Sequence, residues 1–527
     1  MSALPKRTRR ELAVTLAAGL PALLALHALS FGRVPTGLEG GPAVEALRGV
    51  HLIVRRRFEV MSFAIGTSAE TLWLYVMGAS VELFGPRWSS VVLPSVVAAA
   101  AVVALTVFAA RRLDPDTPPA IPFLLSAGSV WLFHYGQVGL RAISAPLFFV
   151  LAILLVHAGE AAGGSKRIRF AAGFVLGLSV YAYSSCRVLA PAWLLWAVAG
   201  ELRKPRAERR YRAALGPTLL GIAVASIPNF LFFLREPGEF LFRGYYVYRG
   251  GWVWKVVNVF WTALLPFHHP RFYTVWLGPG HNFDATAVSL TSAGVHPVDP
   301  VTAAAFACGL VLAFRARRSA GLSYLLWTLG TGTLLLGISG PSLTRLLLLQ
   351  PALVILASLA LGRAWRQAPR ARFALAAALL VPGALGFAEY AWRFGPSPDA
   401  QSDYLAPANA MSARARDLAD QDPALRVLLV TRKGRDIAKF YNYRHIERIW
   451  LVEGLPVKPS AVADALLRFR PGVVLVERGD AFREVAASLG APGGEGLFAE
   501  IRLPAEGDDT PAPERGNIRR LWNEIRR

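Results

Sequence analysis

Long apolar segments alternate with short polar connections along most of the chain before residue 394. A helix that crosses the hydrocarbon core of a bilayer needs about 20 mainly apolar residues. Several segments approach that length, so we predict a polytopic α-helical membrane protein. We expect about eleven spans, at Leu12–Phe31, Val91–Ala110, Ala120–Phe133, Pro146–Ala158, Phe170–Tyr183, Val188–Gly200, Ala213–Leu234, Val301–Phe314, Leu322–Ile338, Leu346–Leu361 and Phe373–Ala391.

Three other stretches predict helices that lie in the interface between lipid and water. Apolar residues recur at spacings of three and four between Ala43 and Val54, and a second helical stretch, Glu70–Phe84, ends before Gly85. The third stretch, Gly250–Leu265, contains three tryptophans, a residue type that is enriched at membrane surfaces.

The pattern changes after Arg393, where Gly395–Pro398 indicates a linker. Short β-branched runs then alternate with helical patterns, which predicts a small α/β domain. We therefore divide the chain into a membrane domain, residues 1–393, and a soluble domain, residues 394–527. The predicted strands are Arg426–Thr431, Arg448–Val452 and Gly472–Glu477, and the predicted helices are Ser460–Arg468 and Asp480–Leu489. No Gly-x-Gly-x-x-Gly follows a strand, so nucleotide binding is not supported.

Composition agrees with a membrane protein, since 54% of the residues are apolar and only 17% are charged, against roughly 25% in an ordinary soluble chain. The net charge of +22 would by itself indicate a nucleic-acid partner. The basic residues, however, gather before the first span and in every second connection, as cytoplasmic segments require. We therefore exclude nucleic acid and expect a cytoplasmic N-terminus and an outside C-terminus. Counting Gly250–Leu265 as a twelfth span would put Arg315 and Arg318 outside, against this pattern.

Three arginines break the charge rule, because Arg141, Arg187 and Arg345 fall at the outside ends of predicted spans. Arginine binds phosphate through two parallel hydrogen bonds, so these residues are candidates for a lipid phosphate. The alternative is that each extends its side chain to the interface or pairs locally. Tyr183 is a candidate to line a sugar or lipid cleft, or belongs to an interfacial aromatic belt.

A divalent metal is possible but not indicated by a fixed motif. His268, His269 and His281, with Asp284 nearby, are ligand types for such an ion, yet their spacing fits a loop equally well. The chain has two cysteines, which excludes a cysteine-rich metal site.

Four short strings resemble those of the C-type glycosyltransferases, in particular bacterial members similar to glycosyltransferase family 39. Ser68–Tyr75 followed by Leu83–Gly85 is similar to the family's Gly-Arg-Glu-Pro-Leu-x-x-Tyr string, which ends in Leu-Phe-Gly. Arg141 with the following Pro146–Leu147 resembles an arginine before the fourth span. Residues 181–187 resemble Tyr-x-Tyr-x-x-x-Arg, and residues 345–351 resemble an arginine followed six residues later by proline. The strings occur in the family's order over residues 1–393.

The resemblance implies a bacterial inner-membrane enzyme that moves a sugar from a polyprenyl phosphate carrier to an acceptor outside. An acidic residue would take the proton of the acceptor hydroxyl, and cations would stabilise the departing phosphate. The family's usual Asp-Glu pair is absent, because Gly41 and Pro42 stand at its positions. Glu39, two residues before these positions, is the first replacement candidate, with Glu45, three residues after them, as its alternative. Glu70, which matches the family's glutamate, is a further candidate. The null hypothesis for Glu70 is a carboxylate that only stabilises a helix start.

We therefore predict a membrane glycosyltransferase that uses a polyprenyl-phosphate sugar and an outside glycan, lipid or protein acceptor. The missing Asp-Glu pair motivates an alternative, a non-catalytic protein of the same fold that acts in binding or assembly. A lipid or glycan transporter is a third possibility, although we see no internal repeat and the charges cluster at the ends of the spans.

Overall fold

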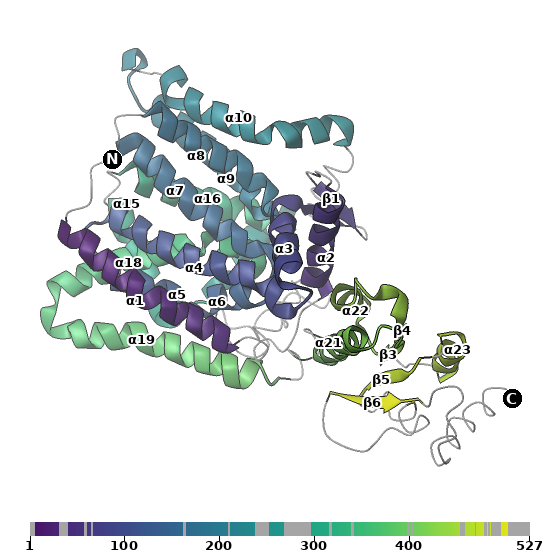
Figure 1. Ribbon diagram of the computed structural model, residues 1–527. Coiled ribbons are helices and arrows are strands. Elements are labelled where there is room, and N and C mark those ends of the chain that lie inside the picture. The colour runs from purple at the N-terminus through teal and green to yellow at the C-terminus, as the bar shows by residue number, and fades with distance from the viewer. Residues whose placement is uncertain are drawn as a thin grey trace. The chain divides into compact units, whose positions relative to one another are not determined.

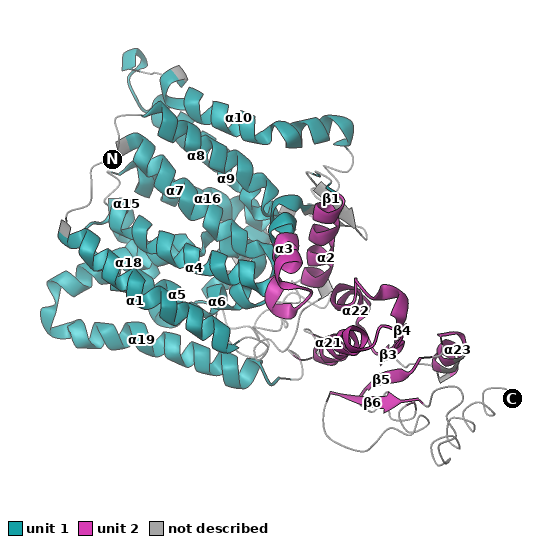
Figure 2. Ribbon diagram, in the orientation of Figure 1, with its two compact units in different colours: residues 1–31, 56–76, 92–397 teal, residues 32–55, 77–91, 398–527 magenta. Residues whose placement is uncertain are grey.

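The computed structural model forms two compact units, which are drawn in Figures 1 and 2. The helical unit comprises Met1–Phe31, Arg56–Val76 and Val92–Ser397, and the mixed unit comprises Gly32–Arg55, Met77–Val91 and Pro398–Arg527. The structure describes residues 6–30, 40–56, 59, 61–64, 67–161, 165–208, 211–237, 252–267, 297–315, 319–338, 342–397, 401, 405–453, 459–469, 471–478, 482, 485 and 497–503. The predicted domain boundary after residue 393 remains a prediction.

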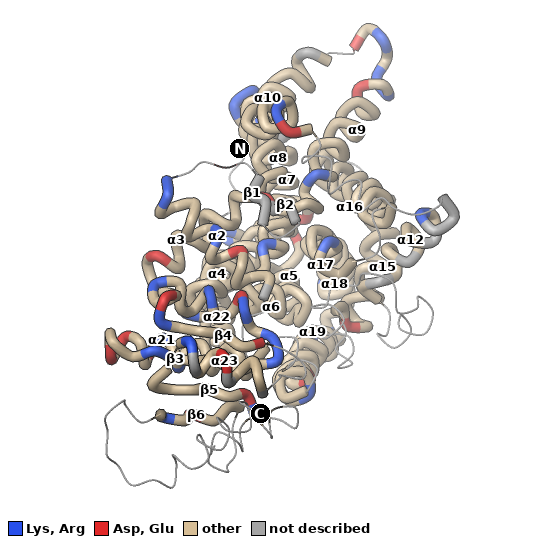
Figure 3. Tube along the Cα trace, turned by 90° about the vertical axis from the view of Figure 1, so that its right-hand side faces the viewer, with Lys and Arg blue, Asp and Glu red and all other residues tan. Residues whose placement is uncertain are grey.

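Seven helical segments in the described part of the chain are long and apolar enough to cross a membrane. Figure 3 shows that helices such as α16 and α18 carry few charged residues along their length. The segments are α1 (Lys6–Ser30); α4 (Trp88–Leu113); η1 (Arg141–Ile143) with α7 (Ser144–Ala161); α10 (Tyr211–Arg235); α16 (Ala320–Ile338); α17 (Leu343–Leu346), η6 (Leu347–Leu349) and α18 (Gln350–Gln367) in one run; and η7 (Pro369–Ala371), α19 (Arg372–Glu389) and η8 (Tyr390–Phe394) in another. The polytopic helical fold is thus confirmed.

The other four predicted spans are shorter helices. They are α8 (Lys166–Leu178), α9 (Leu189–Leu202), α15 (Pro300–Arg315) and the pair α5 (Ala120–Ala127) and α6 (Val130–Gln137). The break between α5 and α6 has a local cause. The Ser129 hydroxyl accepts a hydrogen bond from the Leu132 amide at 3.3 Å, so Ser129 caps a new helix instead of continuing the old one.

Glycines allow two pairs of spans to approach closely. Figure 1 shows α8 beside α10, and a Cβ atom on Gly173 of α8 would lie 1.9 Å from the carbonyl oxygen of Thr218 on α10. A Cβ on Gly309 of α15 would likewise lie 1.8 Å from the Leu356 carbonyl oxygen on α18. Lipid supplies no hydrophobic force between helices, so such close packing is a main source of their association.

Polar side chains inside the helical unit join the first and last spans to α6. The Gln137 side-chain amide lies 2.9 Å from Nδ1 of His27 and donates to the His27 carbonyl oxygen at the same distance. Nδ1 of His134 lies 2.9 Å from the Tyr390 hydroxyl. All four side chains are buried, so these contacts satisfy groups that would otherwise be costly in an apolar interior.

The predicted interfacial helices are present as α2 (Gly40–Val54), α3 (Thr71–Phe84) and α12 (Trp252–Leu264). Gly85, which ends α3, has a φ of 81°, a backbone conformation that favours glycine. A hairpin that the sequence did not predict, β1 (Met61–Ala64) and β2 (Thr67–Glu70), precedes α3 and pairs Met61 with Glu70. The depth of these elements in a membrane remains a prediction.

The mixed unit contains a four-stranded sheet in the order β4-β3-β5-β6. Strands β3, β4 and β5 are parallel, and β6 is antiparallel to β5. The three predicted strands are confirmed within two residues, whereas β6, α21 and α22 were missed. The elements are α21 (Ala406–Gln421), β3 (Val427–Thr431), α22 (Arg435–Tyr441), β4 (Ile449–Glu453), α23 (Pro459–Phe469), β5 (Val473–Glu477) and β6 (Phe498–Arg502). Most of the predicted helix Asp480–Leu489 lies outside the described residues.

Alternate residues of the buried strands β3 and β5 pack on opposite faces of the sheet. Leu428 and Val430 join a cluster with α23, and Val427 and Leu429 join a cluster with α21. Both faces are covered, which explains why these strands are continuous apolar runs rather than alternating ones. Helix α2 also belongs to this unit, where it packs against α22.

Two carboxylates accept hydrogen bonds from the backbone amides that follow β3. Glu477 accepts hydrogen bonds from the Thr431 hydroxyl at 2.6 Å and from the Arg432 amide at 2.8 Å. Glu453 accepts one from the Gly434 amide at 3.0 Å. In nucleotide-binding sheets the loop after such a strand offers its amides to a phosphate. Here those amides are already engaged, in agreement with the absence of a glycine-rich motif.

Candidate functional site

A buried carboxylate lies between two of the three arginines that break the charge rule. Glu70, which ends β2, is 1% exposed. Its Oε1 lies 3.3 Å from Nη2 of Arg187, and its Oε2 lies 3.7 Å from Nε of Arg141. All three residues belong to the helical unit. The structure therefore joins three residues that the sequence analysis selected on separate grounds.

Both arginines stand in a tight turn immediately before a long apolar helix. Arg141 begins η1, which leads into α7, and the Ser144 hydroxyl donates to the Arg141 carbonyl oxygen at 2.6 Å. Arg187 lies in η3 (Ser184–Val188), which leads into α9. Both arginines therefore belong to the turn at the positive end of a helix dipole, an arrangement that favours an anion.

Arg345 likewise stands in a short helical turn at the start of a long helical run. It lies in α17, where the Ser342 hydroxyl accepts a hydrogen bond from the Arg345 amide at 3.3 Å. Helix α17 packs against η3, and η6 packs against η1. The segments that carry Arg141, Arg187 and Arg345 are thus neighbours in the fold.

Tyr183 lies beside this cluster. The Cζ atom of Arg141 is 5.8 Å from the centroid of the Tyr183 ring, within the range of a cation–π contact. The ring therefore helps to orient a guanidinium group that already faces Glu70. Together, Glu70, Arg141 and Arg187 carry one positive charge in excess, which a phosphate oxygen would balance.

The sequence analysis missed Glu59, an acidic residue whose backbone is bonded to the residue after Glu70. The Thr71 hydroxyl donates to the Glu59 carbonyl oxygen at 2.6 Å, and the Glu59 amide donates to the Tyr75 hydroxyl at 2.8 Å. Glu59 is thereby attached to the first turn of α3, which directly follows Glu70. No motif marks Glu59, and its acidic side chain in the predicted first outside loop is the signal that would have suggested it.

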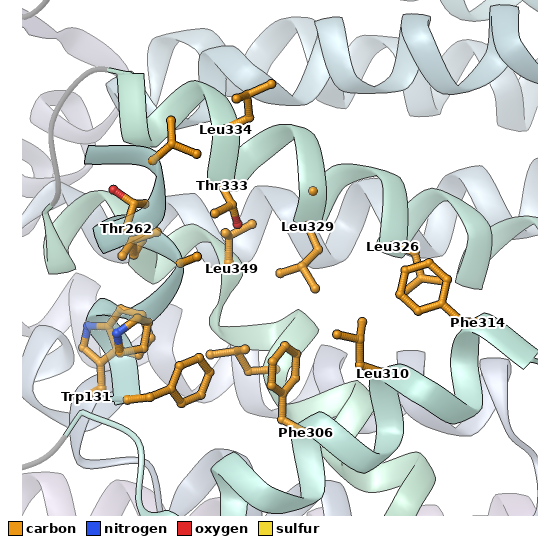
Figure 4. Close-up of a pocket in the computed structure, with 17 residues that line it drawn as sticks. Trp131, Thr262, Phe306, Leu310, Phe314, Leu326, Leu329, Thr333, Leu334 and Leu349 are labelled. Carbon is orange, nitrogen blue, oxygen red and sulfur yellow. The ribbon is translucent and has the colours of Figure 1, made fainter. Parts of the chain in front are cut away.

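An apolar pocket of about 380 Å³ opens among α12, α15, α16 and the run from α17 to α18 (Figure 4). Its wall includes Phe306, Leu310, Leu329 and Leu349, and it also includes Leu346, the residue after Arg345. An apolar chain fits this lining, and Arg345 precedes one of the lining residues in the chain.

Some predicted residues lie outside the described part of the chain. These are Glu39 and the possible metal ligands His268, His269, His281 and Asp284. Within the described ranges, no group of three or more His, Cys, Asp or Glu side chains is arranged to hold a metal ion.

Comparison with solved structures gives alignments that cover nearly all of this chain. ArnT from Cupriavidus metallidurans in the apo state aligns over 93% of this chain and 97% of its own, with a TM-score of 0.54 and 13% sequence identity. ArnT from the same organism bound to undecaprenyl phosphate aligns over 93% and 98%, with a TM-score of 0.56 and 12% identity. No protein-family model and no curated protein sequence matches the chain. At these identities the likeness concerns the fold alone.

Proposed function

We propose that this chain, which has the fold of a C-type glycosyltransferase, moves a sugar from a polyprenyl phosphate to an acceptor outside the bacterial inner membrane. The observation that carries the proposal is the buried contact of Glu70 with Arg141 and Arg187. The binding of undecaprenyl phosphate by ArnT, a protein of the same fold, supports the choice of carrier.

In this proposal the arginines bind the phosphate of the donor. Glu70 holds the two guanidinium groups in place before the donor arrives, and the phosphate then takes over part of their hydrogen bonding. Charge-assisted bonds from arginine would stabilise the phosphate as it leaves the sugar. Arg345 would approach the same phosphate from α17, and Tyr183 would keep Arg141 in position.

The apolar pocket beside Leu346 would hold part of the isoprenoid chain. Its apolar lining suits a hydrocarbon, and its position next to Arg345 in the chain suits a lipid whose head group is an anion. The topology with the N-terminus inside and the C-terminal domain outside would then expose the reaction to an outside glycan, lipid or protein.

The test is transfer from a radiolabelled polyprenyl-phosphate sugar by purified protein in lipid nanodiscs. We expect Arg141→Lys and Arg187→Lys to bind the donor roughly ten to a hundred times more weakly, because each loses about 1.5–3 kcal/mol of charge-assisted hydrogen bonding. Arg393→Lys is the matched control, because its side chain is 66% exposed and pairs with Glu389 one turn away. Equal donor binding in all three variants would refute the assignment of the phosphate site.

A second candidate function is a non-catalytic protein that binds the carrier. The observation in its favour is that both carboxylate oxygens of Glu70 already face arginines, while the usual Asp-Glu pair is absent. Donor binding without transfer to any tested acceptor class would favour this function over the enzyme.

A further inference from the structure

We propose that Glu59 is the carboxylate that takes the proton from the acceptor hydroxyl, a role predicted from the sequence for Glu39 or Glu70. The proposal rests on the proposed transfer reaction and names a catalytic residue for it. It follows from a difference between the environments of Glu59 and Glu70, two acidic residues of the helical unit, since the Glu59 backbone is bonded to the residue after Glu70.

The first observation concerns position. Glu59 is held by backbone hydrogen bonds at both of its ends, since its carbonyl oxygen accepts from Thr71 at 2.6 Å and its amide donates to Tyr75 at 2.8 Å. Thr71 is the residue after Glu70, so the two contacts hold Glu59 beside the turn from which Glu70 reaches the arginines. A base must be fixed in this way, because misplacement by about 1 Å can remove most of its effect.

The second observation concerns charge. Within the described ranges, no Lys, Arg or His side chain forms an ion pair with the carboxylate of Glu59, whereas Glu70 has two such partners. A positive neighbour favours the ionised form of a carboxylate and makes it a weaker proton acceptor. Glu59 is also half-buried rather than enclosed, so a substrate hydroxyl has access to it.

The third observation concerns Tyr75, whose hydroxyl accepts a hydrogen bond from the Glu59 amide. The pKa of the Tyr75 hydroxyl is raised, mainly by burial and further by the negative charge of Glu59, while the hydrogen bond with the Glu59 backbone lowers it. The raised pKa keeps the Tyr75 hydroxyl protonated near neutral pH, and this hydroxyl is bonded to the backbone of Glu59.

Two other carboxylates of the helical unit are engaged in local structure. Asp299 accepts hydrogen bonds from the amide and hydroxyl of Thr302 at the start of α15. Glu389 pairs with Arg393 at 3.7 Å. Neither is available to an acceptor at the arginine cluster without the loss of its own contact.

These groups account for the bonds and the proton of the transfer step. The acceptor oxygen forms a bond to the anomeric carbon of the sugar, and the bond from that carbon to the phosphate oxygen breaks. The bonding electron pair leaves with the phosphate, which Arg141 and Arg187 hold. The hydroxyl proton passes to the Glu59 carboxylate and afterwards to water.

The experiment compares Glu59→Gln, Glu70→Gln and Glu39→Gln with the unchanged protein in nanodiscs. It measures transfer from a polyprenyl-phosphate sugar and, separately, binding of undecaprenyl phosphate. We expect Glu59→Gln to bind the carrier normally and to lose roughly a hundredfold to ten-thousandfold in transfer rate. Thr71→Val, which removes the hydroxyl that holds Glu59, should lower the transfer rate in the same direction without weakening carrier binding. Glu389→Gln is the control for the loss of a carboxylate outside the site.

The outcomes separate the two proposals. Normal transfer by Glu59→Gln would overturn the role of Glu59 and leave the transferase proposal standing. Loss of carrier binding together with transfer would show a structural role and would also overturn it. The absence of transfer by the unchanged protein with every acceptor class would refute the proposed function, and the role of Glu59 with it. Protonation of a catalytic base lowers the transfer rate at acid pH. If the proposal is correct, the remaining activity of Glu59→Gln should not show this decrease.

Discussion

Nη2 of Arg187 lies 3.3 Å from Oε1 of Glu70, although 117 positions separate the two residues in the chain. Neither residue is explained by the general rules for membrane helices, because one is a buried acid and the other a basic residue at the predicted outer end of a span. Their contact explains why both charged residues occur here, since each charge compensates the other in a protein interior.

The contact predicts an unusual response of Glu70→Gln. Removal of one partner from a buried ion pair typically costs about 3–5 kcal/mol, because the other charge stays buried without compensation. We expect the variant to unfold at a lower temperature without ligand. Undecaprenyl phosphate should then raise the unfolding temperature more than it does for the unchanged protein, because the phosphate no longer competes with Glu70.

Thermal unfolding of nanodisc samples with and without the lipid measures both effects, with Glu389→Gln as the control. A ligand-induced increase equal to that of the unchanged protein would contradict the idea that Glu70 and phosphate share the arginines.

The apolar pocket predicts a dependence on the length of the carrier. Leu329→Trp would fill part of the pocket and exclude some of the chain. We expect the KM for an undecaprenyl donor to rise at least about tenfold. This factor corresponds to about 1.4 kcal/mol of binding free energy, slightly less than the contribution of two buried methylene groups at about 0.8 kcal/mol each. The KM for a donor with two or three isoprene units should change little.

Leu219→Trp on α10 is the control, since Leu219 is 40% exposed and does not line the pocket. The pocket hypothesis fails when both substitutions change the KM for the long donor equally.

The contact between α8 and α10 predicts that two glycines differ sharply in tolerance. Gly173→Leu would place side-chain atoms where the Thr218 backbone lies, and overpacking of this kind commonly costs about 1–3 kcal/mol or more. A Cβ atom on Gly216 of α10 would meet nothing within 4 Å, so Gly216→Leu should be tolerated. Size-exclusion chromatography and the unfolding temperature in detergent give the comparison, and similar behaviour of the two variants would argue against the close helix contact.

The mixed unit should show a pH dependence at one ion pair. Arg414 of α21 binds Glu500 of β6 through hydrogen bonds of 2.8 and 3.2 Å, and these bonds are the main reason that the pKa of Glu500 is lowered. A lowered pKa in the folded state means that the pair contributes its full stability above the unfolded pKa of about 4.3. The contribution is lost as the pH falls through the folded pKa of Glu500.

Amide hydrogen exchange of β6 measures this difference in the full chain. Protection relative to Glu500→Gln should be present at pH 7 and should disappear in strong acid. A constant ratio over this range would contradict a role for the pair in holding α21 to β6.

Much of the fold could be predicted because lipid and water impose simple patterns. Helices occur at all eleven predicted spans, and the three parallel strands β3, β4 and β5 have the expected positions. The lengths of the helices were less predictable. Ser129 divides one apolar run into α5 and α6 through a single capping hydrogen bond, which hydropathy does not detect.

The candidate site could be predicted in part, and the reason is again physical. Arg141 and Arg187 stood out because positive charge is unexpected at outer span ends, and Glu70 stood out through a family string. Glu59 has no such signal, because its place depends on backbone hydrogen bonds with Thr71 and Tyr75, which form only when β1 and β2 pair and α3 begins. The antiparallel strand β6 was missed because only two of its five residues are buried, so it forms no continuous apolar run.

The separation of Glu70 from its partners has a consequence for biosynthesis. A ribosome completes the hairpin β1–β2 long before it reaches Arg141, and Arg187 emerges later still, with the helices α4 to α8 made in between. Until then the carboxylate of Glu70 has neither arginine to compensate it, and its burial in the nascent protein would be unfavourable. We therefore expect the hairpin β1–β2, which lies in the predicted first outside loop, to pack into the helical unit late, when the helix that follows Arg187 has inserted.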